Sequence, residues 1–156
     1  WLQWKEAGWL TITPGNVVDH QYIRAELVAL SKIYSVQTVG FDPWGALQLS
    51  IDLDQSDGIK MVETRQGFAT LSEPSKDLEA RIMNGKIRHA NNPVLRFCAA
   101  NAVVTKDPAG NIKPDKSSKN GKIDGIVASI MALARANLEP KAPEDPYSSG
   151  QGFRQL

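Results

Sequence analysis

The chain lacks the features that mark secreted and membrane-inserted proteins. Its 156 residues include one cysteine, Cys98, so no internal disulfide can form. Cys98 lies among the apolar residues Val94, Leu95 and Phe97, a setting typical of a reduced core residue. No run of about 18 apolar residues occurs, and the first residues do not have the pattern of a signal peptide. We therefore expect a cytoplasmic protein that does not enter a membrane.

Two common kinds of catalytic motif are also missing. The chain has two histidines, His20 and His89. His20 falls on the polar side of a predicted helix and is most simply solvated. His89 lies in a turn region, where hydrogen bonding is the simpler role, so a zinc hydrolase is disfavoured. No G-x-x-x-x-G-K sequence is present, so nothing indicates the phosphate loop of an ATPase.

The net charge is too small to indicate a nucleic-acid partner. Eighteen basic and 17 acidic residues leave +1, so a polyanion could be bound only by a local patch. One such patch occurs at residues 104–122, where five lysines and two aspartates give a local net charge of +3. These lysines could stay solvated or contact phosphates, and the sequence alone leaves both readings open.

The hydrophobic pattern predicts alternating helices and strands. We expect strands at Leu10–Thr13, 35–42 and 59–65, and helices from Asn16 to about Tyr34, over 44–53, over Lys76–Met83, within 92–103 and over 121–136. Asn16 or Asp19 could cap the first helix. Residues 67–75 and 106–122 are expected to be loops. This order argues for an α/β fold with crossover units and a mainly parallel sheet.

The domain organisation expected from the sequence is one domain followed by a tail. Residues 1–137 contain all the predicted helices and strands and nearly all the core candidates. Residues 138–156 contain three prolines, two glycines and few core candidates, so we expect a flexible tail there.

Two aspartates are candidates for metal binding. Asp42 ends a predicted strand, where ligands collect in open α/β sheets, but it could also cap the helix that follows Pro43. Asp124 opens the last predicted helix, "KIDGIVASIMALARA", and could equally cap its backbone amides. If the two converge, their oxygen ligands favour magnesium or manganese over zinc.

Several longer stretches resemble one protein family. In order, they are "TPGNVVDHQYI", "VGFDPWGA", "ARIMNGKIRHANNPVLRFCAANAVV", "GNIKPDK" and "KIDGIVASIMALARA". They are similar, over residues 1–137, to the nuclease half of the large terminase subunits of tailed bacteriophages and prophages. The resemblance implies a ribonuclease-H-like mixed α/β fold. It also implies a metal-dependent endonuclease that cuts concatemeric double-stranded DNA at the start and end of genome packaging.

The resemblance also implies roles for particular residues. In that family, acidic residues lie on the first strand, at the end of the fourth strand and at the start of a late helix. Asp42 matches the second of these positions and Asp124 the third, so both are expected to be catalytic ligands of two Mg²⁺ or Mn²⁺ ions. Lys113, Lys116, Lys119 and Lys122 are the expected DNA contacts. The first acidic residue and its strands have no counterpart here, so we expect a sheet without its first strands, unpaired strand edges and a chain that could be inactive alone.

The resemblance implies several binding partners, and two other functions remain as alternatives to the nuclease. The implied partners are double-stranded DNA, the ATPase domain of the terminase, the portal protein and the small terminase subunit. One alternative is a catalytically inactive prophage remnant that binds DNA or a packaging partner without cutting. Another is a resolvase or transposase of the same fold, which fits the acidic residues but not the order of the motifs.

Overall fold

A computed structural model describes residues 1–138 as a mixed α/β fold. In chain order its elements are α1 (Leu2–Glu6), α2 (His20–Ile33), β1 (Val39–Phe41), α3 (Leu47–Gln55), β2 (Met61–Glu63), α4 (Phe68–Met83), α5 (Pro93–Asn101), β3 (Ala102–Lys106), β4 (Ile112–Lys116) and α6 (Asp124–Leu138). The mixed α/β class expected from the sequence is confirmed. Apart from Leu138, which ends α6, the expected tail at 138–156 lies outside the described residues.

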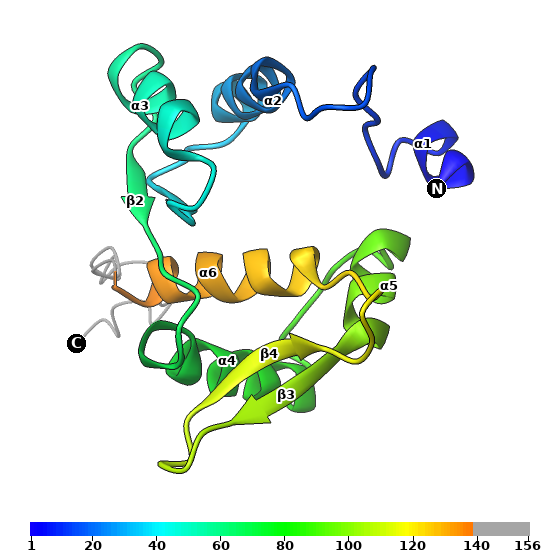
Figure 1. The fold of residues 1–156 in the computed structure, drawn as a ribbon, viewed down its shortest axis with the longest axis vertical. Coiled ribbons are helices and arrows are strands. Elements are labelled where there is room, and N and C mark those ends of the chain that lie inside the picture. The colour runs from blue at the N-terminus through cyan, green and yellow to red at the C-terminus, as the bar shows by residue number, and fades with distance from the viewer. Residues whose placement is uncertain (139–156) are drawn as a thin grey trace, which may run out of the picture.

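The strands of the described part form two small sheets. β1 and β2 are parallel, with Val39 opposite Met61, and β3 and β4 form an antiparallel hairpin. Each of these strands has one neighbour within residues 1–138, so each also has an unpaired edge, as expected. Helix α6 contacts β1, α4 and α5, and Figure 1 shows it between α2 and α3 on one side and α4 and the hairpin on the other. Helix α6 thus packs directly on the parallel sheet, and α4 lies between it and the hairpin.

Two separate hydrophobic clusters stabilise the fold. The first joins Leu49 and Leu53 of α3 to Ile59, and it also receives side chains from α2, β1 and β2. The second joins Leu71 of α4 to Ile130 and Met131 of α6. The apolar spacing that predicted α6 therefore marks the side of that helix that packs on α4.

Helix α2 begins later than Asn16, and Asp19 is its cap. The Asp19 carboxylate accepts a hydrogen bond from the Gln21 amide at 2.9 Å, which satisfies one of the free amides at the helix start. Farther along α2, Arg24 Nε donates to Asp57 Oδ2 at 2.6 Å, and the side chains are 27% and 18% exposed. This ion pair ties α2 to the segment that follows α3.

The Arg24–Asp57 pair predicts a pH-dependent difference in stability. The hydrogen bond from Arg24 lowers the pKa of Asp57 below its ordinary value of 3.8. Because the folded-state pKa is lowered, the stabilisation is fully present above pH 3.8 and is lost as the pH falls through the folded-state value. We expect Asp57→Asn to have a lower melting temperature than the parent at pH 7, and the difference to shrink steadily below pH 3.8. A constant difference from pH 7 to pH 2, measured by circular dichroism, would contradict this origin.

The expected strand at 10–13 and the expected loop at 67–75 were both wrong. Residues 10–13 form no strand, because no other described strand pairs with them. The expected loop at 67–75 is instead the first half of α4, and Pro74 sits inside the helix. Burial of Leu71 and Pro74 against the rest of the fold outweighs the local preference for a loop.

The basic stretch at 106–122 is also more ordered than expected, because it contains β4. The turn before β4 is closed by Asp107, whose backbone amide donates to the Asn111 carbonyl at 3.0 Å and whose carboxylate accepts from the Asn111 amide at 2.8 Å. Ile112 is buried, and its amide donates to the Ser72 hydroxyl of α4 at 3.1 Å. A single apolar residue thus anchors a strand that is otherwise polar.

None of the helices in residues 1–138 has the length and apolar character needed to cross a membrane.

Candidate functional site

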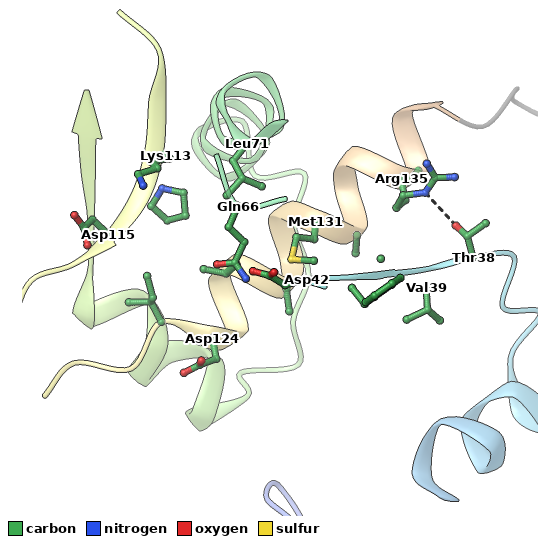
Figure 2. A pocket seen from close by; sticks show the side chains of 18 of the residues that line it. Thr38, Val39, Asp42, Gln66, Leu71, Lys113, Asp115, Asp124, Met131 and Arg135 are labelled. Carbon is green, nitrogen blue, oxygen red and sulfur yellow. Dashed lines mark hydrogen bonds between the residues drawn. The ribbon is translucent and has the colours of Figure 1, made fainter. Parts of the chain in front are cut away.

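A pocket of about 960 Å³ extends along α6, from Ile123 to Ala136, and is bordered by residues 36–42, which include β1, and by residues 113–116 of β4. Both candidate aspartates, Asp42 and Asp124, line this pocket. Figure 2 shows Asp42 beside Gln66, with Lys113 and Asp115 on one side and Arg135 and Thr38 on the other. Residues from three distant parts of the sequence therefore meet in one cavity.

Asp42 is held in the pocket by the end of β1. Its Oδ1 atom accepts a hydrogen bond from the Trp44 amide at 3.0 Å. Helix α3 begins only at Leu47, so Asp42 forms a local turn and does not cap that helix. Within residues 1–138, Oδ2 of Asp42 accepts no hydrogen bond and forms no ion pair, so this oxygen is available to a cation.

Asp124 is the first residue of α6 and is exposed. Its carboxylate has no hydrogen bond or ion pair with any residue that the structure describes, so it does not cap the helix through its side chain. The burial of Ile130 and Met131 against Leu71 fixes which side of α6 faces α4. A carboxylate in the first helical turn is also favoured by the helix dipole.

Asp115 is a third carboxylate on the wall of the pocket, and it already has partners. It accepts hydrogen bonds from the Lys116 amide at 2.7 Å and from the Thr105 hydroxyl at 2.9 Å. These hydrogen bonds, the first of them most strongly, lower the pKa of Asp115 below its usual value. Asp115 is therefore a structural carboxylate of the hairpin that adds negative charge to the pocket.

The four candidate lysines divide into two pairs. Lys113 and Lys116 of β4 line the pocket, and the ammonium group of Lys113 lies 5.1 Å from the centre of the Phe68 ring. Lys119 and Lys122 are exposed in the loop between β4 and α6 and do not line the pocket. The structure thus brings two of the four lysines to the cavity that contains the aspartates.

The side chains present suit a magnesium or manganese ion that is also bound by water and substrate. Magnesium is commonly held by one or two carboxylates together with waters and phosphate oxygens, and Asp42 and Asp124 are carboxylates on the lining of this pocket. No group of three or more His, Cys, Asp or Glu side chains within residues 1–138 is arranged to hold a metal ion.

Sequence reasoning missed Gln66, Asp115 and Arg135, all of which line the pocket. Gln66 follows β2, so the rule on the carboxyl ends of parallel strands that selected Asp42 could have selected it too. Asp115 lies between Lys113 and Lys116 but was counted only as a charge. Arg135 is eleven positions after Asp124 on α6, and no local pattern singled it out.

Comparisons with known proteins identify the family. The family model described as "Terminase large subunit, endonuclease domain" matches residues 1–139. The chain therefore belongs to the terminase large subunit endonuclease domain family, a class of nucleases.

Two curated relatives are similar over most of the chain. The chain is 39% identical over 137 residues to the terminase large subunit of Enterobacteria phage HK97, which covers 87% of the chain and 27% of the phage protein. It is 43% identical over 160 residues to protein YmfN of Escherichia coli strain K12, which covers 99% of the chain and 34% of that protein. The chain thus spans about a third or less of the length of these relatives.

Solved structures agree with the family and with the fold. The crystal structure of the HK97 large terminase matches with a TM-score of 0.77 and 38% identity, over 85% of this chain and 28% of that chain. The large terminase nuclease of thermophilic phage G20c matches with a TM-score of 0.62 and 19% identity, over 78% of this chain and 64% of that one. A second G20c structure, with bound magnesium, has a TM-score of 0.58. At 19% identity the G20c likeness shows the fold alone.

Proposed function

We propose that this chain is part of an endonuclease that cuts concatemeric double-stranded DNA with Mg²⁺ or Mn²⁺ during phage genome packaging. The observation that carries the proposal is that Asp42 and Asp124, 82 positions apart in sequence, line one pocket, each with carboxylate oxygen free of protein partners. Membership of the terminase endonuclease family and the magnesium in a G20c structure of the same fold support it. Two ions per site, in the complete domain, are part of the proposal.

In the proposed mechanism the aspartates hold the metal and the lysines hold the DNA. Asp42 and Asp124 supply negative charge on rigid elements, at the end of β1 and the start of α6. A bound divalent ion would supply Lewis-acid stabilisation of the phosphodiester oxygens and activation of the attacking water. The cations of Lys113 and Lys116 attract the phosphates on either side of the cleaved bond. Lys119 and Lys122 are proposed contacts for duplex that extends beyond the pocket.

The lysines predict a change in the salt dependence of DNA binding. Each phosphate contact contributes about 0.9 to the slope of the logarithm of the binding constant against the logarithm of the salt concentration. We expect Lys113→Ala and Lys116→Ala each to lower the magnitude of this slope by about that amount. Fluorescence anisotropy with a duplex oligonucleotide in calcium would measure it without cutting. Lys86→Ala, at an exposed lysine after α4 that does not line the pocket, is the matched control, and an equal slope in all three variants would contradict the assignment.

The proposed activity is tested by plasmid nicking with manganese. The 156-residue chain is compared with a form that is extended upstream with sequence from the same gene, because the family pattern places a further acidic ligand on an earlier strand. We expect the extended form to nick and linearise the plasmid and the shorter form to be much slower. EDTA should stop both reactions. Absence of cutting in both forms, with folding confirmed by circular dichroism, would overturn the proposal.

One observation favours the second candidate function, a catalytically inactive remnant that binds DNA or a packaging partner. The described residues contain no three-ligand metal group, and a remnant would need none. Under this alternative the extended form binds duplex DNA with the salt dependence given above but does not cut it. The ATPase domain, the portal protein and the small terminase subunit are proposed partners under both functions.

A further inference from the structure

Helix α5 lies unusually close to the first turn of α6, directly beside Asp124. A Cβ atom added at Gly125 would lie 3.3 Å from Leu95 Cδ1 and 3.4 Å from Cys98 Sγ. Cys98 is buried, so its sulfur has little room to move away. Gly125 does not have a positive φ, so glycine is needed here for space and not for its backbone conformation.

The loop that leads into α6 is held by the same helix. The Asn101 carbonyl, at the end of α5, accepts a hydrogen bond from the Ser117 amide at 2.8 Å. The Asn101 side chain in turn donates to the Phe97 carbonyl at 2.8 Å, which fixes its direction. A Cβ atom at Gly121 would lie 3.3 Å from Asn101 Cβ and 3.2 Å from the Ser118 carbonyl oxygen. Glycines therefore allow close contact with α5 on both sides of Asp124.

We propose that α5 positions the Asp124 carboxylate and that Gly125 is the positioning residue. The contact of Gly125 with Cys98 sets how far the first turn of α6 lies from α5, and hence the separation of the Asp124 and Asp42 carboxylates across the pocket. The Ser129 hydroxyl donates to the Gly125 carbonyl at 2.7 Å and adds a further constraint on this turn. The expected effect on kcat depends on the proposed nuclease function, whereas the expected effect on the position of α6 does not.

A small displacement is enough to matter for metal-dependent catalysis. Productive sites hold their groups within about 0.5 Å, and a 1 Å misplacement can cost about a hundredfold in rate. A methyl group at position 125 requires a shift of a few tenths of an ångström in α6 or Cys98. Alanine is a better helix former than glycine, so without a close contact at position 125 the substitution would give an unchanged or higher melting temperature and an unchanged kcat.

The test is a set of four variants: Gly125→Ala, Cys98→Ala, the double variant and Gly67→Ala. Gly67 is the control glycine, because a Cβ atom added there meets nothing within 4 Å. All are made in the 156-residue chain and in its upstream-extended form. Crystal structures give the distance between the Asp42 and Asp124 carboxylates, and plasmid nicking with manganese gives kcat and KM. We expect Gly125→Ala to move the start of α6 away from α5 and to lower kcat on the order of tenfold, with KM for DNA unchanged.

Cys98→Ala removes the buried sulfur that the new methyl group would meet, whereas Leu95 Cδ1, the nearer contact, is the end of a flexible, half-buried side chain that can rotate aside. In the double variant we therefore expect the distance between the Asp42 and Asp124 carboxylates to return to its value in the parent. We also expect kcat to recover to within about twofold of the parent. Gly67→Ala should match the parent. An unmoved α6 in Gly125→Ala, or a displaced α6 with an unchanged kcat, would overturn the inference. If the parent itself never cuts DNA, the proposed function fails, while the displacement and its reversal in the crystal structures still decide the positioning role.

Discussion

Asp124→Asn is expected to lower metal-dependent DNA cutting at least about a hundredfold while the protein stays folded. Loss of a group that merely supports a metal ligand costs about 10- to 100-fold, so loss of the ligand charge itself should cost at least the upper value. The side chain is exposed and has no hydrogen bond or ion pair within residues 1–138, so folding does not depend on it. Only the weak interaction with the helix dipole is lost, about 0.3–1 kcal/mol.

The same substitution at Asp42 gives an independent check. Asparagine keeps an oxygen that can accept the hydrogen bond from the Trp44 amide, so Asp42→Asn preserves the turn while it removes the charge. We expect a comparable loss of cutting, and weaker Mn²⁺ binding by isothermal titration calorimetry. Glu79→Gln, at an exposed carboxylate of α4 outside the pocket, is the control. Full cutting by either aspartate variant would show that its assigned role is wrong.

Leu71→Ala is expected to lower the free energy of unfolding by about 2–5 kcal/mol, the usual range for truncation of a buried leucine. Leu71 is 2% exposed, packs against Ile130 and Met131 of α6, and also lines the pocket that contains the aspartates. Its loss would leave a cavity between α4 and α6, so the metal site and the core should weaken together.

Urea unfolding measures this effect, and α4 also offers a matched control. Met83, at the end of the same helix, is 82% exposed, so Met83→Ala should change stability by less than about 0.5 kcal/mol. Equal, small changes in the two variants would mean that the cluster of Leu71, Ile130 and Met131 does not stabilise the protein.

The elements predicted most accurately are those with a strong apolar period or a clear cap. Helix α6 has apolar residues at helical spacing along most of its length, and Asp19 gives α2 a recognisable start. The segment 35–42 alternates as a strand should, and β1 occupies most of its second half. In each case the local signal and the tertiary packing agree.

The elements that could not be predicted depend on distant contacts. The first half of α4 contains Pro74 and several serines, and its helical state follows from burial against β4 and α6. Strand β4 is a polar segment whose one buried residue, Ile112, meets Ser72 of α4, forty positions away. The apolar alternation at 10–13 predicted a strand, but a strand also needs a neighbour, and none of the described strands pairs with it.

For the candidate site, the sequence predicted the types of residue better than their arrangement. Asp42 and Asp124 were selected by their places at a strand end and a helix start, and both do line the pocket. Their competing role as helix caps could be decided only from the hydrogen bonds. Asp115 could not be distinguished from a solvated charge, because its place on the pocket wall depends on the unexpected hairpin.

The most direct test of the central claim is a crystal structure of the upstream-extended form soaked in Mn²⁺, with anomalous diffraction to locate the metal. We expect an anomalous peak in the pocket, with carboxylate oxygens of both Asp42 and Asp124 at about 2.0–2.2 Å from manganese. A structure in which the two carboxylates face away from each other, with manganese bound elsewhere or not at all, would contradict it.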